Sequence, residues 1–165
     1  MTERKNDLAP RTPSESTTEM LELVLPNDTN NLGNLLGGRL MHWIDMAAAA
    51  AARRHSRGIA VTASMDSLDF HHPVRRGEQV VLKAKVNRAF GTSMEVGVKV
   101  FSEDTATGEL FHTASAYLTF VAIGEDGRPK PVPPVTPETD DERRRFEDAG
   151  RRREARLSRK KHAQM

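Results

Sequence analysis

The chain has 165 residues, the size of one domain or of one domain with tails. Its 25 Lys and Arg against 23 Asp and Glu leave a net charge of +2, which does not indicate a nucleic-acid-binding protein. The lack of cysteine excludes a disulfide framework, a thiolate zinc site and a cysteine nucleophile. The sequence shows neither the apolar region of a signal peptide nor a run long enough to span a bilayer, so we expect a cytoplasmic protein.

Composition divides the chain into four parts. Residues 1–16 are polar and interrupted by proline, and we predict a disordered leader there. Residues 17–124 carry the helix and strand patterns of a single domain. Residues 125–137 are too rich in proline for a helix or a central strand, and they predict an extended arm. Residues 138–165 predict a charged helix and tail, with Thr139 as the N-cap and acidic residues in the first turn.

The first elements of the domain are a strand and a long helix. Residues 18–25 alternate in a way that is typical of a strand, and Pro26 ends it. A polar loop that contains glycine begins near Asn30 and leads into a nearly all-apolar helix. We expect this helix to continue to about His55, with Gly58 as its stop.

Asp45 is the one acid of that helix. On a helical wheel it lies roughly opposite a broad apolar stripe, formed by Leu36, Leu40, Trp43, Ile44, Ala47 and Ala51. Because a helix that is apolar almost all round is usually buried, we expect Asp45 to lie in a crevice lined by another element. Desolvation there favours the protonated form of a carboxylate and can suit it to base catalysis. The alternative is an exposed acid on a thin polar edge, and the wheel does not decide between the two.

Beyond the helix the pattern becomes that of strands. Four strands are predicted, over residues 59–70, 79–90, 94–101 and 110–123. The connections between them are short enough for turns, so we expect four antiparallel strands in a meander. One strand, one long helix and a meander predict an α+β fold, in which a curved antiparallel β-sheet wraps around one central α-helix.

Few residues form a recognisable catalytic motif. The sequence has no G-x-S-x-G elbow and no histidines with metal-ligand spacing. His71 and His72 would point to opposite faces of a strand, so loop histidines are the favoured interpretation. Gly37 and Gly38 expose backbone N–H groups at the positive end of the helix dipole, which suits an oxyanion or a phosphate, although glycines at a helix start are common.

Two polar loops remain open to a plain structural interpretation. Asn30 and Asn34 can orient a water or a carbonyl group, or cap the helix, and capping is favoured for Asn34. Residues 88–93 place two hydroxyl groups at a strand turn, which is also what an ordinary hairpin would do.

Several blocks of the sequence, taken together and in order, resemble the hot-dog acyl-CoA thioesterases. They are residues 30–38 with 43–45, 61–70 and 88–96, followed by 133–142 in the tail. The likeness is strongest to the cytosolic, brain-type acyl-CoA hydrolases and to the acetyl-CoA hydrolases built of paired hot-dog domains, and it runs from about Leu21 to Lys161. It implies a hot-dog fold over residues 17–124 and hydrolysis of acyl-CoA to free CoA and a fatty acid, in lipid metabolism.

The resemblance also implies roles for individual residues. Asp45 is the catalytic carboxylate, as base or nucleophile, and Asn30 of a partner subunit is the second catalytic residue. CoA is held by two strand segments and by a basic residue of the C-terminal helix: Ala63, Ser64 and Met65; Thr92, Ser93 and Met94; and Arg152 or Arg153. The implied assembly is a homodimer with two shared sites, and larger forms such as trimers of dimers. No cofactor is implied, because CoA belongs to substrate and product.

These roles agree with what a thioester needs. The bond is already activated, so hydrolysis requires a water, a base and a donor for the oxyanion. Asp45 can be the base, the helix start at Gly37 and Gly38 can polarise the carbonyl, and Asn30 can hold the water or the thioester. The small residues near Asp45 leave space for an acyl chain, with Trp43 or Met41 as the residue that limits its depth.

Three other functions are weighed against hydrolysis. An acyl-CoA sensor would keep the pocket but has no need of Asp45 and Asn30. A hot-dog hydratase would use a D-x-N-x-x-H loop, which Asp28 and Asn30 match, but Gly33 stands at the histidine position. Binding to nucleic acid would rest on the basic C-terminal helix alone, and its many acids favour a solvated face of mixed charge.

Overall fold

The protein is described by a computed structural model that covers residues 8–165, and the first seven residues of the predicted leader lie outside the described part. The expectation of disorder is wrong for the residues that follow. Pro13–Ser16 form a short 3₁₀ helix in which Pro13 and Ser16 are buried. Ser16 Oγ accepts a hydrogen bond of 2.9 Å from Val86 N, and Arg11 N donates one of 2.9 Å to Pro134 O. These polar groups bind backbone groups of the domain, which composition alone does not reveal.

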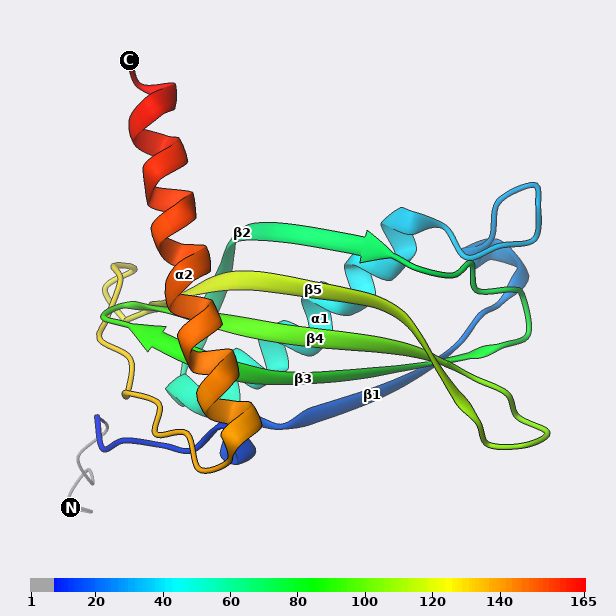
Figure 1. The fold of residues 1–165 in the computed structure, drawn as a ribbon, viewed down its shortest axis with the longest axis horizontal. Helices are drawn as coiled ribbons and strands as arrows, with labels where there is room; N and C mark the ends of the chain where they lie inside the picture. Colours follow the sequence, from blue (N-terminus) through cyan, green and yellow to red (C-terminus); the bar gives the residue numbers. More distant parts are fainter. Residues whose placement is uncertain (1–7) are drawn as a thin grey trace.

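Five strands and two long helices make up the rest of the fold (Figure 1). Their bounds are β1 Thr18–Leu23, α1 Gly37–Ser56, β2 Ile59–Phe70, β3 Gln79–Phe90, β4 Ser93–Glu103, β5 Leu110–Ile123 and α2 Asp140–Ala163. All strands are antiparallel and form one sheet in the order β1-β3-β4-β5-β2. Figure 1 shows α1 along one face of this curved sheet and α2 across the other, which is the predicted hot-dog architecture.

The strand order corrects the predicted meander. Only β3, β4 and β5 follow one another as hairpin neighbours, whereas β2 pairs with β5 at the far edge. The segment 71–78 therefore crosses the end of the sheet instead of making a hairpin. Its backbone bonds go to the loop before α1, with Leu35 N donating to Val74 O at 2.7 Å and Arg76 N donating to Gly33 O at 3.0 Å. Length alone does not distinguish such a crossing from a turn.

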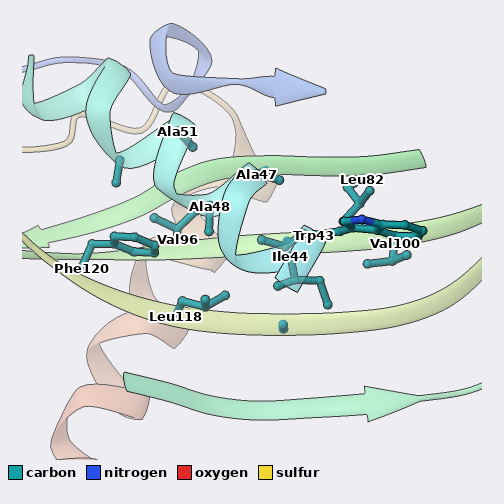
Figure 2. Close-up of a cluster of buried hydrophobic side chains, with 14 of the residues drawn as sticks. Trp43, Ile44, Ala47, Ala48, Ala51, Leu82, Val96, Val100, Leu118 and Phe120 are labelled. Carbon is teal, nitrogen blue, oxygen red and sulfur yellow. The ribbon is translucent and has the colours of Figure 1, made fainter. Parts of the chain in front are cut away.

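Helix α1 supplies one side of the core. Figure 2 shows its apolar side chains against those of β3, β4 and β5: Trp43, Ile44, Ala47, Ala48, Ala51, Leu82, Val96, Val100, Leu118 and Phe120. The predicted stripe is buried except at its first residue, Leu36, which is 40% exposed at the N-cap. The helix ends at Ser56, one residue beyond the expected His55, and Arg57 rather than Gly58 takes the left-handed conformation after it, with φ of 56°. Arg53 and Arg54 in the last turn place positive charge near the negative end of the helix dipole.

The edge strand β2 carries two β-bulges. Its register against β5 shifts between Thr62 and Ser64 and again between Met65 and Ser67, so Ala63 and Asp66 are extra residues without a partner. A bulge bends its strand and redirects the neighbouring side chains. Strand β2 therefore turns Thr62 toward α1, while Asp66 reaches the opposite face and contacts α2.

Helix α2 lies on the outer face of the sheet from its first turn to Arg156, which contacts Asp66 of β2. Thr139 is its N-cap, as predicted, and it forms a capping box with Glu142. The last turns of the helix extend past the β2 edge (Figure 1). Among residues 8–165 neither helix combines the length and the apolar character needed to cross a membrane.

Candidate active site

Asp45 of α1 and Thr62 of β2 form the centre of the candidate site. The Thr62 hydroxyl donates a hydrogen bond of 2.6 Å to Asp45 Oδ1. Asp45 is half-buried, and Thr62 is exposed at the sheet edge. The expectation that another element would line Asp45 is therefore confirmed, although the carboxylate is not enclosed within the protomer. The second carboxylate oxygen, Oδ2, accepts no hydrogen bond within the described residues, so it remains open to a water or a ligand.

Asn30 lies in the loop before α1, and its side chain organises that loop. Its Oδ1 accepts hydrogen bonds from Leu32 N at 2.9 Å and from Asn34 N at 3.1 Å. An amide oxygen engaged in this way leaves the Nδ2 group as a donor to whatever approaches from outside. Within residues 8–165 no hydrogen bond joins Asn30 to Asp45, so the described protomer does not bring the two predicted catalytic residues together.

The first turn of α1 has no side-chain cap. The N-cap residue is Leu36, so the capping role expected for Asn34 is wrong; Asn34 instead forms a β-bridge with Arg75. The exposed Gly37 and Gly38 occupy the first two helical positions, where N–H groups have no partner inside a helix. Free donors at the positive end of a helix attract an anion or a developing oxyanion.

Asp28 has a structural role. It is buried, it accepts a hydrogen bond of 2.9 Å from Leu25 N, and its other oxygen is 3.1 Å from Arg39 Nε in the first turn of α1. The carboxylate that would match the hydratase loop is thus already neutralised by Arg39 and held by the backbone, which disfavours the hydratase alternative.

The side chains of the two predicted CoA-binding segments differ in their exposure to solvent. Ala63 is the exposed bulge residue of β2, while Ser64 and Met65 are half-buried. In the turn between β3 and β4, confirmed by the pairing of Phe90 with Ser93, Thr92 and Ser93 are half-buried. Met94, however, is fully buried in the core, so only its backbone could meet a ligand.

The arginines of α2 are also not equivalent. Arg152 makes two hydrogen bonds to the buried carboxylate of Glu95, at 2.7 and 3.0 Å, and its guanidinium lies 3.6 Å from the ring centre of Tyr117. Burial acts to lower the pKa of Arg152, but the bonds and charge of Glu95 outweigh it and raise the pKa above its usual value. Arg153 stacks over Phe90 at 4.6 Å and forms no ion pair among the described residues. Of the two predicted phosphate ligands, Arg153 is therefore the one that remains available.

A further ion pair joins α2 to the bulged part of β2. Arg156 NH1 is 2.7 Å from Asp66 Oδ2, and both side chains are largely buried. The pair fixes the second bulge of β2 against α2, next to the segment with Ala63 and Ser64. Neither Asp66 nor Thr62 was selected from the sequence. The strand carries three hydroxyl residues and two acids, and the sequence does not distinguish Thr62 and Asp66 among them until the bulges are known.

Comparison with known proteins adds the family. A family model described as the thioesterase superfamily matches residues 32–109. The chain is 45% identical over 150 residues to the uncharacterized acyl-CoA thioester hydrolase YkhA of Bacillus subtilis, covering 91% of this chain and 87% of that protein. The chain belongs to the hot-dog thioesterase superfamily. It also matches the mouse cytosolic acyl coenzyme A thioester hydrolase at 34% identity over 158 residues, but it spans only 42% of that longer protein.

Solved structures agree with this membership. An acyl-CoA hydrolase from Staphylococcus aureus, in complex with butyryl coenzyme A and coenzyme A, superposes with a TM-score of 0.88 at 38% identity, covering 93% of this chain and 94% of that one. Alanine variants of the Staphylococcus aureus enzyme at an asparagine, an aspartate and a threonine have also been solved. A hexameric acyl-CoA thioesterase gives a TM-score of 0.88 at 42% identity, covering 92% and 97% of the two chains.

Proposed function

We propose that the protein is an acyl-CoA thioesterase that hydrolyses acyl-CoA to free CoA and a fatty acid. The observation that carries this proposal is the Thr62–Asp45 hydrogen bond at an open sheet edge. The hydroxyl fixes one carboxylate oxygen and leaves the other free, which is the arrangement required of a base or nucleophile that must face a bound thioester. The uncapped first turn of α1 adds N–H donors for the charge that develops on the carbonyl oxygen.

The spacing of the residues supports these roles. In the Staphylococcus aureus hydrolase the asparagine, aspartate and threonine replaced by alanine are separated by fifteen and seventeen residues. The same intervals separate Asn30 from Asp45 and Asp45 from Thr62 in this chain. Three matching residue types at two matching intervals favour a shared site over a chance likeness.

The site is shared between two copies of the chain in this proposal. Within residues 8–165 no strand pairs with the outer edge of β2, and this strand exposes Ile59, Val61 and Phe70, at 56%, 46% and 52%. Such an edge can pair with another strand. When the same edge of two copies pairs in antiparallel fashion, the contact is symmetric and the assembly is a closed dimer. The Nδ2 group of Asn30 from one copy would then donate to the thioester or water that Asp45 of the other copy addresses. The hexameric relative fits an assembly of such dimers.

CoA would lie along the bulged part of β2. Ala63, Ser64 and Met65 would bind it with backbone groups that the bulge releases from the sheet. Thr92, Ser93 and the backbone of Met94 would contact it from the β3–β4 turn, and Arg153 would meet a phosphate. No resident cofactor is required, because CoA enters and leaves with the reaction. The cytoplasmic location remains a prediction that the name of the mouse relative favours.

The test is thiol release from acyl-CoA by wild type, Asp45→Ala and Asn30→Ala. Both variants should lose at least a hundredfold in kcat. When the two are dissociated, mixed in equal amounts and reassociated, half of the dimers pair the two variants, and each such dimer holds one intact site. About a quarter of the wild-type activity should therefore return. A wild type that hydrolyses no acyl-CoA would refute the function; an inactive mixture would refute the shared site.

A further inference from the structure

A pocket lies at the N-terminal end of α1, and none of the residues that line it has a role in the proposed site. It has a volume of about 280 Å³ and a wall that is mostly apolar, formed by Leu35, Leu40, Phe70, Pro73 and Val74, with His71, His72 and Thr113 as its polar members. The residues come from the loop before α1, the first turns of α1, the end of β2 and the crossing segment 71–78. Neither Trp43 nor Met41 lines it: Trp43 is buried against the sheet and Met41 is 44% exposed.

The pocket and the Asn30 loop form one hydrogen-bonded unit. Leu35 N donates to Val74 O at 2.7 Å, which joins two parts of the pocket wall. Asn30 N donates to Asn34 O at 2.9 Å, and Asn34 forms a bridge with Arg75 beside Val74. A group bound by the Asn30 side chain is therefore held at a fixed position relative to this wall.

Phe70 stands between the pocket and the helix start. A Cβ atom at Gly37 would lie 3.7 Å from the Phe70 ring, so the ring is in van der Waals range of the first turn of α1. The side chain is 52% exposed in the protomer and reaches the start of α1 at Gly37. A carbonyl bound at the N–H groups of Gly37 and Gly38 would therefore lie close to the Phe70 ring.

The size and chemistry of the pocket define its ligand. Sites that hold whole drug-sized ligands measure about 300–1,000 Å³, so this pocket is suited to part of a larger substrate. Among the described residues its lining contains no lysine or arginine, the side chains that usually meet a phosphate, so the pocket is poorly suited to the nucleotide end of CoA. A hydrocarbon chain matches both properties, and a second copy paired along β2 would cover the side that is open in the protomer.

From this geometry we infer that the pocket is the acyl-chain subsite and that Phe70 and Leu35 set the chain length. The inference rests on the proposed function and deepens it. The acyl chain enters past Phe70 and lies against Leu35, Leu40 and Val74, in the subunit that contributes Asn30. Substrate length is then determined at the end of β2 and not by a side chain in the middle of α1.

The test compares kcat/KM for butyryl-CoA, octanoyl-CoA and palmitoyl-CoA. Phe70→Ala enlarges the entrance and should raise the palmitoyl-to-butyryl ratio about tenfold, because each methylene accepted or rejected by an apolar pocket changes selectivity by a factor of ten or more. Leu35→Phe fills the wall and should lower the palmitoyl-to-butyryl ratio about tenfold. Phe70→Trp also narrows the entrance to the pocket. Because position 70 is about half exposed, this larger ring can be accommodated even if Leu35→Phe does not fold.

Phe111→Ala is the matched control, since Phe111 is 46% exposed on β5 and does not line this pocket. It should leave the length profile unchanged. The inference is overturned if Phe70→Ala, Leu35→Phe and Phe70→Trp all hydrolyse butyryl-CoA normally and keep the wild-type length profile. A wild-type protein without activity on any of the three substrates would instead overturn the proposed function, and the subsite with it.

Discussion

The Thr62 hydroxyl on β2 donates a 2.6 Å hydrogen bond to the Asp45 carboxylate on α1, and so ties the edge strand to the central helix. Hydrogen bonds to a charged group are worth about 1.5–3 kcal/mol. If this bond orients Asp45 for catalysis, Thr62→Val should lower kcat at least tenfold with little change in the melting temperature. Thr62→Ser keeps the hydroxyl and should restore most of the rate. A valine variant with wild-type kcat would show that the bond does not serve the reaction.

Arg153 is predicted to act in binding and not in the chemical step. Arg153→Met keeps much of the apolar contact with Phe90 but removes the charge that would meet a phosphate. The expected result is a KM for acyl-CoA raised about tenfold, with an unchanged kcat. Steady-state kinetics at low and moderate salt measure both parameters. An effect on kcat alone would contradict the assignment, and Arg151→Met, at an exposed position that pairs with Asp148, is the matched control.

Arg152 is predicted to stabilise the fold. Glu95 is 1% exposed, so removing its cation leaves a buried charge without compensation. Arg152→Leu should therefore cost about 3–5 kcal/mol of unfolding free energy. Adding Glu95→Gln removes that charge and should recover part of the loss, which urea denaturation at neutral pH can measure. Two single variants whose effects simply add would mean that the ion pair contributes no coupling.

His55 is predicted to make stability depend on pH. It is fully buried at the end of α1, where one ring nitrogen lies 2.7 Å from Pro133 O and Nδ1 has no partner within the described residues. Burial lowers the pKa of His55 below its ordinary value of 6.5, and the charges of Arg11 and Arg57 act in the same direction. The unfolded chain therefore binds a proton at a higher pH than the folded protein does.

The sign of the effect follows from that difference. Above pH 6.5 the residue is neutral in both states and has no influence. As the pH falls below 6.5 the unfolded state gains the proton first, so stability decreases until the lower folded pKa is reached. His55→Gln can still donate to Pro133 O but does not titrate, and its urea midpoint should depend less on pH between 8 and 5. An identical pH profile for wild type and variant would refute the role of His55; His162→Gln, at the exposed end of α2, is the control.

The elements that could be predicted from the sequence are those that local pattern determines. The bounds of β2, β3 and β5, the N-cap Thr139 and the turn at Gly91 are all as expected, because alternation, capping chemistry and turn residues act over a few positions. The path of segment 71–78 was mispredicted, because its backbone partners lie in a loop about forty residues earlier. The ordered turn at Pro13–Ser16 was missed for the same reason.

The candidate site shows the same limit. Helical periodicity left open whether Asp45 faces another element or solvent, and it could not identify Thr62, which is brought there by pairing between β2 and β5. It also could not separate Arg152 from Arg153, which are adjacent in sequence and differ only in what they contact across the sheet. The roles of Asn30 and Asp45 came from family resemblance, and they remain predictions until the assembled dimer is tested.

The two bulges of β2 restrict where residues can be inserted into this chain or deleted from it. Removing or adding one residue between Thr62 and Asp66 would turn every side chain on one side of the change to the opposite face of the sheet. Thr62 would then point away from α1, or Asp66 away from Arg156. Insertions and deletions should be tolerated in the exposed loop 104–109 at the far end of the sheet, whereas this short part of β2 has a fixed length.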